Sequence, residues 1–400
     1  MGSQTINEGS LVGAPSTSSA EAAPWMTFSD LYEHLFNFAQ GVGVGVPPSA
    51  HRAAIVSAYE EVIAAHEWSF LRGMLRVQGY ANQTTGTLAY THSTRIATLS
   101  DATFPSWADG QGGAIYVDDV LCEIEAQLSS TTVRFKTGRN PGEDLSAETY
   151  SLFKLWYALP QDFLALEDPI AENTGGLGRH VPFSSMVYEH RADQTSGEFG
   201  AWSIGPNPTG GHALYVYPAL SAATRIDAPY IKRPRDVSIT GLAPAHKAGT
   251  ISVSGTTVTG DSTSFASGMA GSVLRVSSTS TAPDGVAGPT DNLFAEERLI
   301  ESVTDTTTLT LALAGTTASA VGYRVSDPLS VGRVAWNALR RCAEMHLART
   351  RNFKNYRDVA SAYYAALGKA KGDDAVEQPR RVMGRSAGGR RRLSDMYVLE

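Results

Sequence analysis

The chain has 400 residues, of which 42% are hydrophobic and 18% are charged, and its formal net charge is −7 at pH 7. A chain of this length is expected to divide into about two to four domains. The negative charge gives no reason to expect a nucleic-acid-binding surface over the chain as a whole. The 38 glycines and 19 prolines indicate turns and short strands more than long helices.

We expect neither a membrane span nor a secretory signal. No run approaches the roughly 18 consecutive apolar residues of a transmembrane helix, and the first residues lack the basic and apolar regions of a signal peptide. Cys122 and Cys342 both lie in apolar runs. Each is therefore predicted to be a small buried side chain, and neither a disulfide nor a zinc site is expected.

The N-terminal segment divides into an arm and a helical part. Residues 1–24 are rich in Ser, Thr, Ala and Gly without apolar periodicity, which predicts a flexible arm. Thr27 or Ser29 can cap a first helix that Gly41 ends. The apolar residues expected on one side of this helix are Leu31, Leu35 and Phe38.

A second helix is predicted after the Pro47-Pro48 pair, with Ser49 as its N-cap. Its apolar residues recur at helical spacing, and they are Ile55, Tyr59, Val62, Ile63 and Phe70. We assign residues 25–84, which contain both helices, to the N-terminal part of a helical core.

From residue 85 onward the apolar pattern has a period of two, and the same order of elements occurs twice. Residues 85–156 and residues 249–327 each contain several short strand-like runs that follow turns of small residues. The second copy carries an extra loop at about residues 277–297. We interpret the two as copies of one small antiparallel barrel or sandwich inserted twice.

Aromatic and apolar residues mark the same place in both copies. Phe104 and Trp107 follow the second strand-like run of the first copy, and Phe265 and Met269 follow the second run of the later copy. These two pairs are predicted to be matched anchors in the core or at the rim of each module.

Residues 157–248, between the two copies, are predicted to form a β meander with a short helix near residues 184–192. Three histidines occur in this region: His180, His190 and His212. Their spacing fits no compact set of metal ligands, and no Asp or Glu motif accompanies them.

After Pro328 the apolar period becomes helical again. Ser330 can cap one helix, and Asn355 with Asp358 can begin another. Residues 328–372 are therefore assigned to the C-terminal part of the helical core. Residues 373–400 lack apolar periodicity and form a basic C-terminal tail.

The predicted fold class is α+β. A helical core is built from the N- and C-terminal segments, with a central β meander and two similar inserted small antiparallel β-barrel or sandwich modules.

A set of aromatic, proline and acidic residues spans the predicted meander. It comprises Tyr157, Leu159, Pro160, Asp162 and Phe163, then Tyr217-Pro218, and then Tyr230, Arg233 and Pro234. This set resembles the pattern of the head-to-tail adaptor (gateway or connector) proteins of short-tailed bacteriophages. The run that begins at Trp68, at the end of the second helix, is similar to that family as well.

The resemblance implies a structural virion protein at the head–tail junction, assembled in the host cytoplasm. Such a protein would form a homo-oligomeric ring of about twelve copies that joins the capsid portal protein to the tail. It would extend the channel through which double-stranded DNA passes, without sequence-specific binding, and provide docking sites for the tail nozzle and the fibres. No enzymatic activity, catalytic residue, cofactor or metal site is expected.

The C-terminal tail is the predicted portal-docking segment. Arginine pairs well with carboxylate or phosphate groups, and an apolar tip follows the basic run, so the tail suits a groove between subunits. The residues assigned to portal docking are Arg380, Arg381, Arg385, Arg390, Arg391, Arg392, Tyr397, Val398 and Leu399. A solvated, disordered end is the alternative interpretation.

Two other functions stay open. The chain would act as a different phage tail structural protein, such as a tube, fibre-attachment or decoration subunit, if the β modules were its main functional part. A tail-associated glycan hydrolase is a further alternative. The sequence provides no nucleophile elbow and no paired carboxylates in a common local context for that chemistry.

Overall fold

The computed structural model describes residues 25–43, 45–167, 171–172, 178–186, 196–208, 210–240, 243–284 and 293–377. These residues form a mixed α+β fold in which strands predominate and the antiparallel sheets are curled, so the predicted mixed class is confirmed. None of the helices in these ranges is long and apolar enough to cross a membrane.

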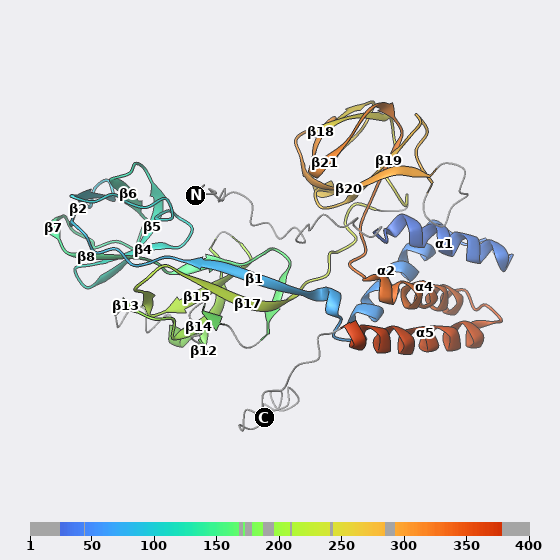
Figure 1. Ribbon diagram of the computed structural model, residues 1–400, viewed down its shortest axis with the longest axis horizontal. Helices are drawn as coiled ribbons and strands as arrows, with labels where there is room; N and C mark the ends of the chain where they lie inside the picture. The colour runs from blue at the N-terminus through green and yellow to red at the C-terminus, as the bar shows by residue number, and fades with distance from the viewer. Residues whose placement is uncertain are drawn as a thin grey trace, which may run out of the picture.

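Figure 1 shows the helices gathered at one end of the molecule. A long two-stranded ribbon, β1 with β17, runs from the helices towards a group of sheets at the opposite end. A separate curled sheet, formed by β18 to β22, lies beside the first helix.

Four helices share one hydrophobic cluster, although two come from each end of the chain. They are α1 (Phe28–Gly41), α2 (Pro48–Ala64), α4 (Trp336–Thr350) and α5 (Tyr356–Glu377). Helix α1 begins and ends as predicted: the Thr27 side chain accepts a hydrogen bond from the Asp30 backbone N–H, and the Asp30 carboxylate accepts one from the Thr27 backbone N–H.

Helix α2 is shorter than predicted. It begins at Pro48, so Ser49 lies inside the helix instead of capping it, and it ends at Ala64 instead of continuing to Phe70. The indole N–H of Trp68 folds back and donates to the backbone carbonyl of Val62 at 2.8 Å. This bond satisfies one of the carbonyl groups that a helix end leaves open. Phe70 lies in the 3-10 turn that follows, η1 (Ser69–Leu71).

Helix α4 also begins later than the sequence suggests. A 3-10 turn, η3 (Arg333–Ala335), precedes it, and the first helical residue is Trp336. Ser330 does not cap the helix. Its side-chain oxygen accepts a hydrogen bond from the backbone N–H of Arg235 at 3.2 Å, and its own N–H donates to the hydroxyl of Tyr59 at 3.1 Å.

The central ribbon pairs β1 (Arg72–Gly79) with β17 (Thr224–Lys232) over the whole length of β1. The other edge of β17 pairs with β10 (Phe163–Leu166) and β11 (Ala171–Glu172). A second sheet has the order β12 (Arg179–His180), β14 (Ala201–Pro206), β15 (His212–Tyr217), β9 (Trp156–Ala158), and β13 (Ser196–Gly197) pairs with β16 (Ala219–Leu220). The predicted helix near 184–192 lies partly outside the described residues, and residues 183–186 are helical.

The first β module is a curled seven-stranded sheet with the order β7-β2-β3-β6-β5-β4-β8. Its strands are β2 (Thr87–Thr91), β3 (Ile96–Ser100), β4 (Gly113–Val117), β5 (Val120–Gln127), β6 (Thr132–Phe135), β7 (Leu145–Glu148) and β8 (Tyr150–Lys154). Its concave side holds a hydrophobic cluster of its own.

The second β module is a curled five-stranded sheet with the order β18-β21-β20-β19-β22. Its strands are β18 (Thr250–Asp261), β19 (Val273–Ser277), β20 (Phe294–Val303), β21 (Thr308–Val321) and β22 (Tyr323–Ser326). It too encloses a separate hydrophobic cluster.

The strand pairings of the two modules correspond. Pairs β4–β5 and β4–β8 of the first match pairs β19–β20 and β19–β22 of the second. Pairs β5–β6 and β3–β6 match β20–β21 and the later half of β18 with β21. The modules differ at two points: β2 and β3 form a hairpin and β6 and β7 are separate strands, whereas β18 and β21 each continue as a single long strand.

The residues singled out in both copies occupy matching places. Phe104 and Phe265 are buried in their module cores, and their backbone N–H groups donate to Ser130 O at 2.6 Å and Thr306 O at 2.9 Å. Met269 is buried, whereas Trp107 is only half-buried and stacks on the ring of Tyr80 with centroids 5.3 Å apart.

The turn that enters each module requires glycine. Gly86 and Gly249 have φ angles of +83° and +81°, in the left-handed region. A Cβ atom on Gly86 would lie 2.2 Å from the carbonyl oxygen of Ser100, and one on Gly249 would lie 2.2 Å from that of Asp261. The same turn therefore brings the start of each module against the end of its second strand-like run.

Candidate functional site

The residues predicted to dock on a portal all lie outside the described residues. They are Arg380, Arg381, Arg385, Arg390, Arg391, Arg392, Tyr397, Val398 and Leu399. The described chain ends at Glu377, the last residue of α5.

Several residues that carry the sequence resemblance come together in one place, whereas Tyr217 packs against a separate cluster that includes Trp156 and Tyr215. Tyr157, Leu159, Phe163 and Tyr230 belong to a single hydrophobic cluster between the two central sheets. The rings of Phe163 and Tyr230 stack with centroids 6.1 Å apart.

Asp162 fixes the end of this cluster. Its carboxylate accepts a hydrogen bond from the Tyr230 hydroxyl at 3.1 Å, and its backbone carbonyl accepts one from the N–H of Arg233 at 2.5 Å. Burial and the neighbouring Asp162 carboxylate raise the pKa of Tyr230 to about 12, so this hydroxyl stays a donor at any physiological pH. We call the contacts of Asp162 and Phe163 with Tyr230 the seam. The seam is a structural joint between β10 and the end of β17.

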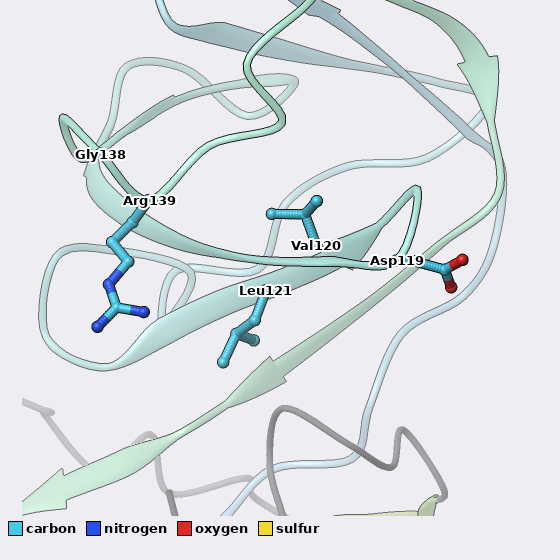
Figure 2. Close-up of a pocket in the computed structure, with 5 residues that line it drawn as sticks. All are labelled: Asp119, Val120, Leu121, Gly138 and Arg139. Atoms are coloured by element: carbon cyan, nitrogen blue, oxygen red, sulfur yellow. The ribbon is translucent and has the colours of Figure 1, made fainter. Parts of the chain in front are cut away.

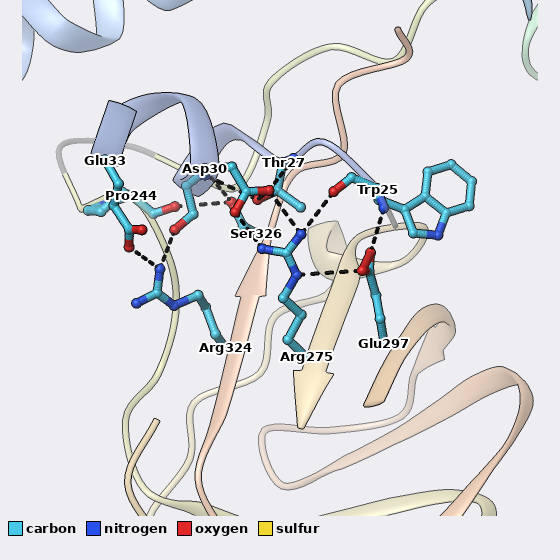
Figure 3. A network of polar contacts seen from close by, with 10 residues as sticks. Trp25, Thr27, Asp30, Glu33, Pro244, Arg275, Glu297, Arg324 and Ser326 are labelled. Carbon is cyan, nitrogen blue, oxygen red and sulfur yellow. Dashed lines mark hydrogen bonds and ion pairs between the residues drawn. The ribbon is translucent and has the colours of Figure 1, made fainter. Parts of the chain in front are cut away.

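A buried ionic network joins the second β module to α1 (Figure 3). Arg275, on β19, is 1% exposed and donates to both carboxylate oxygens of Asp30, at 2.6 and 2.9 Å. It also donates to the backbone carbonyl of Trp25 at 2.8 Å, and its Nε lies 3.6 Å from the Glu297 carboxylate. The Asp30 carboxylate thus caps α1 and holds Arg275 at the same time.

Arg324, on β22, makes a second set of contacts to the same helix. It donates to the hydroxyl of Ser29 at 2.7 Å and to the Glu33 carboxylate. The hydroxyl of Ser326 accepts from the Ser29 backbone N–H at 3.1 Å and donates to the carbonyl of Pro244 at 3.0 Å. Two strands of the module are therefore fixed to the first turns of α1.

Asp327 completes this junction from the end of the module. It is fully buried, and its carboxylate accepts from the N–H groups of Ile239 and Thr240, at 3.0 and 2.9 Å, and from the Thr240 hydroxyl at 2.6 Å. Its backbone carbonyl accepts from the N–H of Phe28 at 2.9 Å. Because the buried Asp327 carboxylate needs all of these hydrogen-bond donors, it restricts the joint to one geometry.

The first module uses the corresponding face for a different kind of contact. Tyr116 on β4 takes the place that Arg275 has on β19, because each strand pairs with its neighbours in the same order. There Ala114 and Phe153 pack on Ala219, with Tyr116 and Leu121 partly buried beside them. One module is joined to the rest of the chain by apolar packing, the other by buried charges.

Two cavities occur near these joints. One, of about 250 Å³, lies between the end of α2 and the ribbon, and its lining includes Ile63, Trp68, Leu164 and Ile231. The other, of about 240 Å³, is a shallow depression of the first module beside Val120, Leu121 and Arg139 (Figure 2). Neither brings together a nucleophile and a base in the manner of an active site.

A buried carboxylate lies beside His66, one of the residues that line the first cavity. Asp374, near the end of α5, is fully buried and lies 3.2 Å from Nε2 of His66. It accepts from the Ser69 hydroxyl at 2.5 Å and from the Ser69 N–H at 3.2 Å. The last helix is thereby fastened to the turn that leads into β1.

One group of side chains in the described ranges could hold a metal ion, namely Glu61, Cys342 and His346. The histidines considered in the sequence lie elsewhere. His180 packs on the ring of Trp202 and His212 on that of Phe163, with centroids 4.6 and 5.7 Å apart, while His190 falls outside the described residues.

Comparison with known proteins gives no family assignment. No protein-family model matches the chain, and a search of curated proteins finds no match either.

Sequence reasoning missed both the ionic junction and the metal-capable group. Asp30 and Arg275 are separated by 245 positions, and no local pattern connects them. For Cys342 and His346 a signal was present, since residues four apart lie on one face of a helix. Their third partner, Glu61, comes from a helix near the other end of the chain.

Proposed function

We propose that this chain is a structural virion protein, a head-to-tail adaptor of a short-tailed bacteriophage, with no enzymatic activity. Copies of the chain form a ring at the head–tail junction that joins the portal protein to the tail. The ring extends the channel for double-stranded DNA, and its β modules offer docking surfaces for the tail nozzle and the fibres.

One observation carries most of the proposal. Part of the adaptor-like pattern converges on a single seam, where Asp162 and Phe163 both contact Tyr230. The convergence supports a common role for these residues in holding the β ribbon, which is what a shared fold requires.

The layout of the molecule supports the same proposal. The four helices gather at one end, and the first β module lies at the other end of the ribbon (Figure 1). We propose that the helices form the core of the ring, and that the two modules are duplicated insertions with outward or tailward surfaces. The matching strand pairings and glycine turns are the evidence for duplication.

The two joints suit a subunit that bears load during assembly. The second module is fixed to α1 by buried charges, and the first by apolar packing on β16. Both joints would hold their modules at set angles, so that every copy in a ring presents the same surface.

The test combines purified protein with the portal protein encoded by the same phage. Size-exclusion chromatography with light scattering should show a complex that neither protein forms alone, and electron micrographs should show a ring whose symmetry fits that of the portal. Co-elution with tail or fibre components but not with portal rings would instead support the alternative, a different tail structural protein.

A further inference from the structure

Three side chains with metal-binding chemistry meet between α2 and α4. Cys342 and His346 lie four residues apart on α4, and Glu61 faces them from α2. The Cys342 sulfur, a ring nitrogen of His346 and a carboxylate oxygen of Glu61 all lie within 4.8 Å of one another. Nε2 of His346 is 2.9 Å from Oε2 of Glu61.

We propose that Glu61, Cys342 and His346 form a Zn²⁺ site that fastens α2 to α4. Zinc bonds of about 2.0–2.3 Å place tetrahedral ligands about 3.5 Å apart, so the group needs only small shifts to hold the ion. Thiolate, imidazole and carboxylate together match the ligand preference of zinc. One thiolate and one carboxylate neutralise the double charge of the ion.

The surroundings of the group leave the fourth position of a tetrahedral zinc to a water from the exposed side. Cys342 is fully buried in the helical cluster, whereas the Glu61 and His346 side chains are 38% and 19% exposed. The ion therefore has a path from solvent on one side and an apolar wall on the other. The buried hydroxyl of Tyr363, on α5, interacts with both Glu61 and Cys342 and would orient these two ligands from outside the metal shell.

Binding must remove the thiol proton. Burial raises the pKa of Cys342 to about 12, so the metal-free protein holds a neutral thiol. Zinc displaces that proton to solvent as the sulfur–metal bond forms, and a bound metal of this kind deprotonates a thiol outright. Without the ion, Glu61 and His346 form only a hydrogen bond at the edge of the helical cluster.

The experiment uses the full-length protein, stripped with a chelator and then titrated with Zn²⁺ or Co²⁺. We expect one Zn²⁺ per chain by elemental analysis after gel filtration, and a rise in Tm of about 5 °C at saturating zinc. Cobalt should produce the near-ultraviolet sulfur-to-metal charge-transfer band, which reports a thiolate ligand directly.

The chain supplies a matched control, because Cys122 is also fully buried but lies in the first β module. Cys342→Ser should abolish the cobalt band, and Cys122→Ser should leave it unchanged. His346→Gln and Glu61→Gln should weaken zinc binding by more than about 100-fold, beyond the effect of losing an outer partner. Circular dichroism should confirm that each variant is folded.

Two results would overturn the proposal. One is wild-type protein that holds no more zinc than Cys342→Ser and shows no cobalt band. The other is a band that depends on Cys122. In either case the three side chains form only a hydrogen-bonded cluster in the helical core.

Discussion

The hydroxyl groups of Tyr150 and Tyr323 make the same hydrogen bond at equivalent points of the two β modules. Tyr150 donates to the backbone carbonyl of Thr85, and Tyr323 to that of Ala248, each at 2.7 Å. Each tyrosine lies on the last strand of its module. Each carbonyl belongs to the residue directly before the glycine of the entry turn, Gly86 or Gly249. This bond ties the entrance of each module to its exit, beside the backbone pairs Gln83–Leu152 and His246–Val325.

Removing this bond should weaken each module to a similar extent. Tyr150→Phe and Tyr323→Phe keep the ring in the core and delete only the hydroxyl, so each should lower local stability by about 1 kcal/mol. Amide hydrogen exchange followed by mass spectrometry would locate the loss in the module that carries the change. Tyr364→Phe is the control, since Tyr364 is 63% exposed. A loss in one module only would contradict the equivalence of the two bonds.

The ionic junction predicts unequal roles for the two carboxylates that surround Arg275, Asp30 and Glu297. Asp30→Asn removes the charge that pairs with Arg275 in two places and leaves a buried cation, which should destabilise the protein by about 3–5 kcal/mol. Burial raises the pKa of Glu297 in spite of the nearby Arg275. A raised carboxyl pKa means that the folded protein loses stability as the pH rises from the unfolded pKa of this group through its folded pKa, so ionisation of Glu297 does not stabilise the fold.

Glu297→Gln should therefore cost much less than Asp30→Asn. The amide oxygen of glutamine can still accept the bond from the Trp25 N–H that Glu297 accepts at 2.9 Å. Urea denaturation of both variants at pH 7, with Glu301→Gln as an exposed control, measures the difference. Equal losses would show that Glu297 is as important to the charge balance as Asp30.

Local patterns were enough to predict several elements. A cap at Thr27 or Ser29 and an end at Gly41 were predicted for α1, and alternation with small-residue turns indicated strands in residues 85–156 and 249–327. They overestimated α2, because the run of apolar residues continues through Trp68 and Phe70 after the helix has ended. There the indole ring and the turn at Ser69 replace helical hydrogen bonds, an outcome set by tertiary contacts.

Long-range polar contacts could not be predicted in the same way. Arg275 lies on a strand, and no local pattern in the sequence predicts its partner. Its burial depends on Asp30 at the far end of the chain. Asp374 was assigned to a basic tail, yet it is fully buried against Ser69, and α5 continues to Glu377. Charge patterns along one segment do not reveal which element from another part of the chain supplies the counter-charge.

The cysteines should be inert in the metal-free native protein. Both are buried, as predicted, and burial raises the pKa of each thiol to about 12. At pH 8 almost no thiolate is present, so a disulfide reagent should modify neither cysteine in the native state and both in denaturant. Cys122→Ser identifies which thiol reacts. Rapid modification of the native protein would show that one core opens on the time scale of the assay.

Removing the C-terminal tail should abolish portal docking without unfolding the protein. Deleting residues 379–400 leaves all of α5 and the Asp374–Ser69 contact in place, so the truncated protein should stay folded. If the tail carries the portal contacts, this protein should no longer bind portal rings. Deleting residues 373–400 is the matched comparison, because it also removes Asp374 and should lower the stability of the helical end.

The same proposal predicts how each part of the tail contributes. Changing the six arginines of the tail to glutamine should weaken portal binding and reduce its dependence on salt, because screened charge pairs are lost. Changing Tyr397, Val398 and Leu399 to serine should weaken binding with the salt dependence unchanged. Sedimentation with portal rings at several ionic strengths measures both effects. Full binding by the protein that lacks residues 379–400 would place the portal contact elsewhere, and the four-helix end would then be the next surface to test.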